Sequence, residues 1–127
     1  MTNMNFIKTI NSDIFYFLSY VSRRPSMWWI KRNYYSLDGF LTGFIIWVSN
    51  AGDKLLNVNK EKLTILDRYV EWRLKLQLEI PNNQLILLDE LYLLASNNDP
   101  EKAFDLFFEL FDEYKKEKWI IYEWDEA

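Results

Sequence analysis

Hydrophobic and polar residues follow a helical repeat most regularly between residues 98 and 119. Large aromatic residues recur there at positions i, i+3, i+4 and i+7, namely Phe104, Phe107, Phe108 and Phe111. Asn98 or Asp99 can cap this segment, and Pro100 suits a first turn, where a missing N–H costs no hydrogen bond. The pattern therefore predicts an amphipathic helix with one aromatic face.

The opposite face of this predicted helix is acidic. It carries four carboxylates, which are Asp105, Glu109, Asp112 and Glu113. One interpretation is a core helix whose back is simply solvated. The other is that this face meets a basic partner, and the pattern alone leaves both interpretations open.

Four further helices are predicted, over residues 5–22, 36–50, 62–79 and 84–96. The first can also begin at Ser12 or Asp13, and Ser36 is the expected N-cap of the second. Residues 72–80 alternate between apolar and polar in a way also typical of a strand. We favour a helix there because Leu, Lys, Gln, Glu and Arg are good helix formers. Residues 84–96 are almost wholly apolar, which predicts a helix at the centre of the core.

The segments between these helices differ in character. Residues 50–61 contain Asn, Gly and Asp and are predicted to form a loop. Residues 23–36 carry too many aromatic residues for a disordered linker and are expected to be an ordered connector. Residues 119–127 form an acidic and aromatic tail, which either docks on the body or serves as a contact arm. Gly39 and Gly43 stand four residues apart, a spacing that favours close approach of another helix.

Together these elements predict an all-α fold. The 127 residues suffice for one domain with a real core, so residues 1–127 are expected to form a single compact bundle of about five helices. Three glycines and three prolines are too few for a protein built from many tight β-turns.

The amino-acid composition excludes several kinds of catalytic and binding site. The chain has no cysteine and no histidine, which excludes disulfides, Cys/His zinc sites, thiol nucleophiles and imidazole catalysis. We expect no cofactor and no bound metal. The N-terminus lacks the pattern of a secretory signal, and the most apolar stretch, residues 40–48, is too short to span a membrane. A cytoplasmic protein is therefore expected, with no membrane partner.

The charge is unevenly distributed along the chain. The net charge is −4, but residues 1–81 hold 11 basic and 7 acidic side chains, whereas residues 82–127 hold 4 basic and 12 acidic ones. A −8 balance in the second part disfavours binding to a phosphate backbone and suits a basic protein partner. Acidity for solubility alone explains the same numbers. Arg23, Arg24, Lys31 and Arg32, interleaved with aromatics, could grip single-stranded nucleic acid, but the acidic remainder argues against it.

Enzymatic activity is not expected. Adjacent carboxylates such as Asp89 and Glu90, or Asp112 and Glu113, point about 100° apart on a helix and so do not converge on one substrate atom. A DNA-binding regulator would need a basic recognition helix, and the most regular helix here is acidic.

Two blocks of the sequence resemble a family of small helical bacterial proteins. Their residues are Arg24-Pro25-Ser26-Met27-Trp28 with Ser36-Leu37, Phe40 and Gly43-Phe44, and then residues 99–114, DPEKAFDLFFELFDEY. They are similar to RPxMY-like, SLxxFxxGY-like and AFxLFFELLDEY-like segments of immunity proteins encoded beside polymorphic or contact-dependent growth inhibition toxins. Trp28 replaces the tyrosine of the first segment.

The resemblance implies a cytoplasmic immunity protein that binds and neutralises a cognate toxin domain, which is basic if it is a nuclease. Together with the charge asymmetry, it suggests that the contact residues come from the acidic helix and the tail, namely Asp105, Glu109, Asp112, Glu113, Tyr122, Glu123, Trp124, Asp125 and Glu126. The alternative is a non-catalytic helical adaptor or structural subunit of another complex. The oligomeric state is left open.

Overall fold

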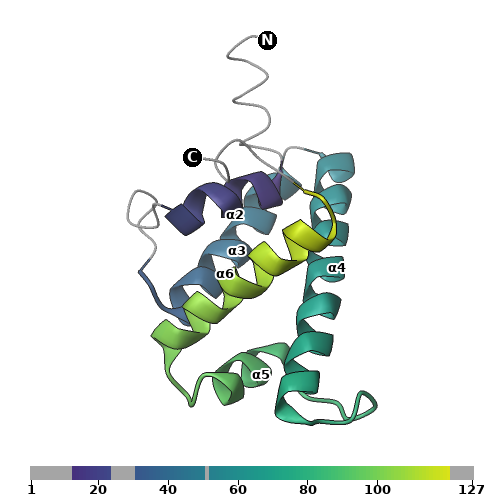
Figure 1. Cartoon of the computed structure of the whole chain (residues 1–127). Helices are drawn as coiled ribbons and strands as arrows, with labels where there is room; N and C mark the ends of the chain where they lie inside the picture. Colours follow the sequence, from purple (N-terminus) through teal and green to yellow (C-terminus); the bar gives the residue numbers. More distant parts are fainter. Residues whose placement is uncertain (1–12, 24–30, 51, 121–127) are drawn as a thin grey trace.

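The computed structural model describes residues 13–23, 31–50 and 52–120, and this part of the chain is helical without any strand (Figure 1). The helices are α2 (Ile14–Arg23), α3 (Tyr34–Ser49), α4 (Asp53–Leu78), α5 (Leu88–Ala95) and α6 (Pro100–Glu117). The predicted all-α bundle of about five helices is therefore confirmed. Three predicted segments lie partly outside the described residues, which omit residues 5–12 of the first helix, 24–30 of the connector and 121–127 of the tail.

Helix α4 organises the bundle. It is the longest of the described helices, with 26 residues, and it contacts α2, α3, α5 and α6. Figure 1 shows α2, α3 and α6 on one side of α4, with α5 at one end of the assembly. Helix α6 also contacts α3 and α5, as its predicted aromatic face requires.

The core is built largely from aromatic rings. Phe104, Phe107, Phe108 and Phe111 of α6 are all buried, which confirms the predicted face. The ring of Phe111 lies 5.5 Å from that of Phe15 on α2, and the ring of Phe107 lies 6.0 Å from that of Tyr92 on α5. Large rings supply much buried area per residue, so short helices such as α2 and α5 can still anchor themselves.

Helix α6 begins as its sequence predicts. Asp99, rather than Asn98, is the N-cap, and its Oδ1 accepts hydrogen bonds from the backbone N–H groups of Glu101 and Lys102 at 3.0 and 3.4 Å. Pro100 occupies the first helical position. The cap satisfies donors that have no partner within the helix.

Helix α3 begins two residues earlier than predicted, and Ser36 is not its N-cap. Asn33 holds that position, and its side-chain oxygen accepts a hydrogen bond from the Ser36 N–H at 2.8 Å. Tyr34 thereby enters the helix and packs its ring 4.9 Å from that of Tyr92. The prediction of close packing at Gly39 and Gly43 is also wrong, because a Cβ built at either position meets nothing within 4 Å.

The predicted loop over residues 50–61 is wrong, because α4 already begins at Asp53. Of the predicted loop, Asn50 and Gly52 are described residues that lie outside the helices. Asn59 belongs to the helix and is fully buried, with its Oδ1 accepting a hydrogen bond from the Ile14 N–H at 2.9 Å. The ambiguous residues 72–78 are helical, as we favoured, and the helix ends at Leu78.

Helix α5 is shorter than the predicted helix over residues 84–96. Residues 85–87 are not helical, and Leu85 and Leu87 are 96% and 71% exposed. The segment between α4 and α5 is bound by the buried Lys75 of α4. Its ammonium group donates hydrogen bonds to the carbonyls of Asn82 and Gln84, at 3.1 and 2.7 Å. The central role predicted for this segment holds for Leu91 and Tyr92, which are buried.

Candidate functional site

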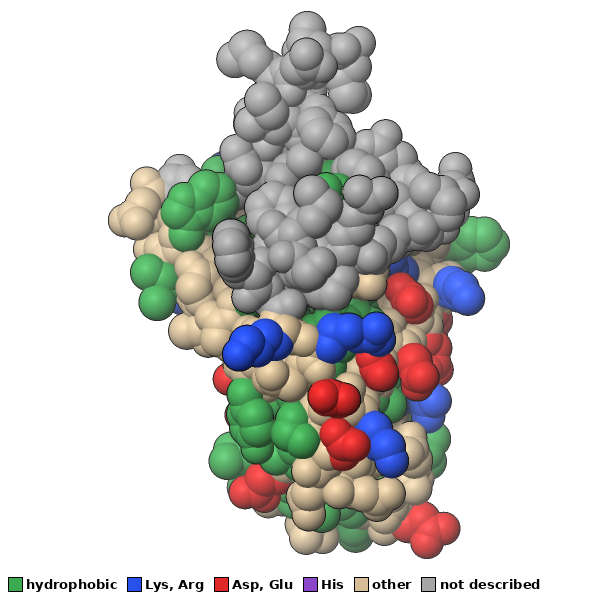
Figure 2. All heavy atoms as spheres, turned by 90° about the vertical axis from the view of Figure 1, so that its left-hand side faces the viewer, with side chains coloured by type: hydrophobic (Ala, Val, Ile, Leu, Met, Phe, Trp, Pro, Cys, Tyr) green, Lys and Arg blue, Asp and Glu red, His purple; other side chains and the backbone are tan. Residues whose placement is uncertain are grey.

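Three of the four carboxylates on the acidic face of α6 are paired with basic side chains, two of which belong to other segments. Asp105 pairs with Arg32 at 2.7 Å, and Glu113 pairs with Arg73 of α4 at 2.9 Å. Asp112 lies 3.4 Å from the ammonium group of Lys115 on its own helix. Figure 2 shows one face of the molecule on which acidic and basic side chains lie beside one another, without a continuous acidic patch.

Glu109 differs from its neighbours on this face. Its side chain is exposed, and it forms no ion pair with any of the described residues. In contrast, the hydrogen bond from Arg73 lowers the pKa of Glu113, which stabilises its charged form. The other predicted contact residues lie outside the described residues, and they are Tyr122, Glu123, Trp124, Asp125 and Glu126.

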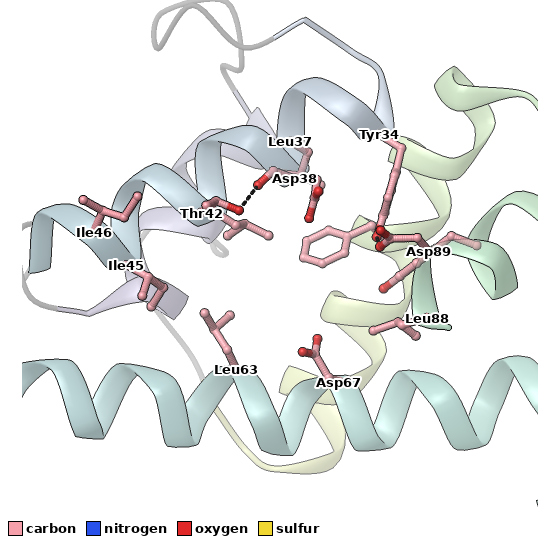
Figure 3. Close-up of a pocket in the computed structure, with 13 residues that line it drawn as sticks. Tyr34, Leu37, Asp38, Thr42, Ile45, Ile46, Leu63, Asp67, Leu88 and Asp89 are labelled. Carbon is pink, nitrogen blue, oxygen red and sulfur yellow. Dashed lines mark hydrogen bonds between the residues drawn. The ribbon is translucent and has the colours of Figure 1, made fainter. Parts of the chain in front are cut away.

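A more unusual concentration of charge lies in an open pocket between α3, α4 and α5 (Figure 3). The pocket has a volume of about 440 Å³, and Phe107 of α6 also contributes to its lining. Six aliphatic side chains line it, namely Leu37, Leu41, Ile45, Ile46, Leu63 and Leu88. The wall therefore suits a hydrocarbon group.

Three carboxylates from three different helices converge on this pocket. Figure 3 shows Asp38 of α3, Asp67 of α4 and Asp89 of α5 around the same space. Over the described ranges, none of the three forms an ion pair, and no basic side chain lines the pocket. The Tyr34 hydroxyl donates a hydrogen bond to Oδ1 of Asp89 at 2.5 Å, which orients that carboxylate. The pocket is thus apolar along its wall and negative at one part of its lining.

Burial and neighbouring negative charges raise the proton affinity of two of these carboxylates. Partial burial, together with the charges of Asp89 and Asp38, raises the pKa of Asp67 to about 6. The pKa of Asp38 is also raised, first by burial and then by Asp89. A positive charge in the pocket would relieve this repulsion.

Two tyrosines complete the polar part of the site. Burial and then the hydrogen bond with Asp89 raise the pKa of Tyr34, so its hydroxyl stays protonated. Tyr92 is 1% exposed, and its hydroxyl has no hydrogen-bond partner among the described residues. Its pKa is raised by burial and by the charges of Asp67 and Asp89, and its side chain lines the pocket.

The prediction from sequence missed this site because its acids are far apart along the chain. Asp38 is the one acidic residue of α3, and Asp89 stands beside Glu90 in the first turn of α5, where acidic residues are common. Asp67 carries a usable signal, since it lies four residues after Leu63 and three before Val70, beside the stripe that packs inward. An acid beside an apolar stripe indicates either a paired charge or a site.

Comparisons with protein-family models, curated proteins and solved structures give no match to this chain. Within residues 13–23, 31–50 and 52–120, no helix is long and apolar enough to cross a membrane. The same residues contain no group of three or more acidic side chains arranged to hold a metal ion. The pocket itself combines three carboxylates with aliphatic side chains in one space.

Proposed function

We propose that this protein is an immunity protein, which binds a cognate bacterial toxin domain and neutralises it. The observation that carries a binding function is the convergence of Asp38, Asp67 and Asp89, without a basic partner, on an open apolar pocket. The immunity role is supported by the resemblance of residues 24–44 and 99–114 to segments of such proteins.

The physical argument starts from the target. A toxin domain that degrades nucleic acid needs a basic cleft, so an acidic and partly apolar surface complements it. Charge accelerates the encounter, and desolvated apolar contacts then hold the complex. Next to the pocket, Ile46 and Trp47 are 63% and 49% exposed and provide apolar area of this kind.

The acidic face of α6 has a second part in this proposal. Because Asp105, Asp112 and Glu113 are already paired, their charges contribute less to a contact than isolated carboxylates would. Glu109 is the strongest contact candidate on this face. Residues 122–126 of the tail also belong to the proposed surface, on the basis of the sequence alone. We therefore assign the main anchor to the pocket and a supporting role to α6.

Co-expression tests the function directly. The protein is produced together with the product of the adjacent upstream toxin-like gene, with a toxin from an unrelated locus as the control. The expected result is co-purification of the pair and restored growth, specific to the cognate toxin. Growth arrest that persists, without a complex, would contradict the immunity role and favour an adaptor of another assembly.

A charge-reversal variant then tests the surface. Glu109→Lys together with Asp105→Lys is compared with Glu61→Lys, which changes an exposed carboxylate of α4. If α6 supports the contact, the double variant protects less well than the wild type, whereas Glu61→Lys protects fully. Circular dichroism confirms that each variant is folded.

A further inference from the structure

We propose that the pocket between α3, α4 and α5 is the anchor site for one basic side chain, an arginine or lysine, of the partner protein. The inference rests on the proposed function for the identity of the partner, but not for the chemistry of the pocket. The guanidinium or ammonium group would lie among Asp38, Asp67 and Asp89, and its hydrocarbon stem would lie along Leu41, Ile45 and Leu63.

Charge complementarity is the first argument. Some acids elsewhere in the described structure have basic partners, as Asp105 has with Arg32 and Glu113 has with Arg73, and others such as Glu109 have none. The three pocket acids come from three helices that the core holds together, and they have no such partner. Like charges held close together are unfavourable, so a bound cation gains from all three.

Hydrogen-bonding capacity is the second argument. Tyr34 donates to Oδ1 of Asp89, which leaves the other carboxylate oxygen available to a ligand. The Tyr92 hydroxyl is buried and lacks a partner among the described residues, and it can accept one N–H. A guanidinium group has five N–H donors and no acceptor, so it matches a site composed of carboxylate and hydroxyl oxygens.

The shape and the lining discriminate against other ligands. An anion would meet three carboxylates and no cation. A metal ion would need a compact set of acidic ligands, and the described residues provide none. Long basic side chains bury an aliphatic stem while their charged end remains with polar groups, and the pocket offers both surfaces in one space.

The pocket also predicts how binding depends on pH. Asp67 is faced by Asp38 and Tyr34 of α3 and by Asp89 and Tyr92 of α5, while α6 contributes the uncharged Phe107. With a pKa of about 6, Asp67 is largely protonated at pH 5 and largely ionised at pH 7. A cation prefers the ionised form, so its affinity should rise between these values, whereas binding at an unperturbed surface acid would not change there.

The first arm of the test uses a small probe. N-acetyl-L-arginine amide is titrated into the ¹⁵N-labelled protein, and amide chemical shifts are followed by NMR. N-acetyl-norleucine amide is the neutral control. We expect saturable shifts on α3, α4 and α5, with a dissociation constant of about 1 to 10 mM that tightens from pH 5 to pH 7. Shifts confined to α6, or equal shifts with the neutral probe, would overturn the proposal.

The second arm removes the charge without a change of shape. Asp38→Asn combined with Asp67→Asn should weaken the arginine probe about 10-fold and remove its pH dependence, whereas Glu61→Gln on the outer side of α4 should change neither. Among the described residues, neither Asp38 nor Asp67 forms a side-chain hydrogen bond that the fold would lose. The NMR spectrum itself reports whether the variant is folded. Unchanged binding by the double variant would contradict the inference.

The third arm separates this inference from the proposed function. The same double variant is tested for protection against the cognate toxin. If the wild type protects and the double variant protects equally well, the pocket is not the anchor and the immunity function stands. If the wild type does not protect, but the arginine probe still titrates into the pocket, the immunity function fails and the preference for an organic cation stands.

Discussion

At the scale of single residues, Asp67 is a carboxylate whose ionisation opposes folding. Its pKa is about 6 in the folded protein and about 4 in an unfolded chain, so the folded state holds its proton more tightly. The wild type therefore loses stability as the pH rises from about 4 to about 6. We predict that Asp67→Asn raises the free energy of unfolding at pH 7 by about 1 kcal/mol, a value reduced for the side chain's exposure to solvent.

Urea denaturation at several pH values checks this prediction. The gain from Asp67→Asn should disappear near pH 4, where the carboxyl group is neutral in both states. Glu61→Gln, on the same helix but away from the pocket, serves as the control. A destabilised Asp67→Asn protein at both pH values would mean that the carboxylate makes a contact needed for the fold.

Asn59 of α4 forms a buried hydrogen bond with another helix, α2. It is fully buried, accepts a hydrogen bond from the first N–H of α2, and donates one to the Leu55 carbonyl at 2.9 Å. Asn59→Ala leaves the Ile14 N–H buried without this acceptor and should lower the free energy of unfolding by about 2 kcal/mol. Asn57→Ala, an exposed asparagine of the same helix, is the matched control and should stay within about 0.5 kcal/mol of the wild type. Equal effects in thermal denaturation would contradict the role of Asn59.

At the scale of elements, α4 and α6 end in the same way. Each is closed by a left-handed residue, Glu79 or Trp119, both with φ of 58°. The next N–H turns back onto the helix, from Ile80 to the Lys75 carbonyl at 2.9 Å and from Ile120 to the Lys115 carbonyl at 2.8 Å. This arrangement is the Schellman motif, in which glycine is the usual left-handed residue.

Glycine at the end of α4 should therefore stabilise the protein. Glu79→Gly removes the steric cost of the left-handed conformation, partly offset by the greater freedom of the unfolded chain, for a net gain of about 0.5 kcal/mol. Gln77→Gly, in the exposed last turn of the same helix, should instead cost about 1 kcal/mol. Chemical denaturation should therefore show opposite signs for the two changes in the free energy of unfolding. A loss with Glu79→Gly would indicate that its side chain has a role of its own.

The sequence predicts the helices better than it predicts their ends. The periodic aromatic residues of α6 and its Asp99 cap are local signals, and both are confirmed. The sequence predicts too late a start for α4, because Asn59 has the polarity of a loop residue. In the structure it is buried in the helix and accepts a hydrogen bond from the Ile14 N–H of α2. Leu85 and Leu87 look like core residues by composition but are exposed, because Lys75 holds the neighbouring segment by its carbonyls. Tertiary hydrogen bonds of this kind leave no periodic trace.

At the scale of the whole molecule, the charge map of the folded protein differs from that of the chain. Residues 82–127 carry a net charge of −8, yet Arg32 and Arg73 from the positive part fold back onto the carboxylates of α6. These pairs span 73 and 40 positions, so no local sequence pattern indicates them. The acids of the pocket also lie far apart in the sequence, on three helices, and only the packing of these helices brings them to one pocket.

This redistribution of charge leads to a prediction for the complex proposed above. Asp38→Asn with Asp67→Asn, and Asp105→Asn with Glu109→Gln, each remove two negative charges and therefore have the same net charge. Both variants should associate with a basic toxin a few-fold more slowly at low salt, and this difference should fade in about 0.5 M salt, because long-range attraction is screened there.

Dissociation should separate the two variants. Loss of the pocket carboxylates removes the proposed counter-charge of a partly desolvated cation, so we expect its dissociation rate to rise about 10-fold or more. Loss of Asp105 and Glu109 affects one carboxylate already paired with Arg32 and one exposed to solvent, so the dissociation rate should change by less than about 3-fold. Surface plasmon resonance at two salt concentrations gives both rates. A reversed order, with fast dissociation only for the α6 variant, would move the anchor to the acidic face that the sequence first suggested.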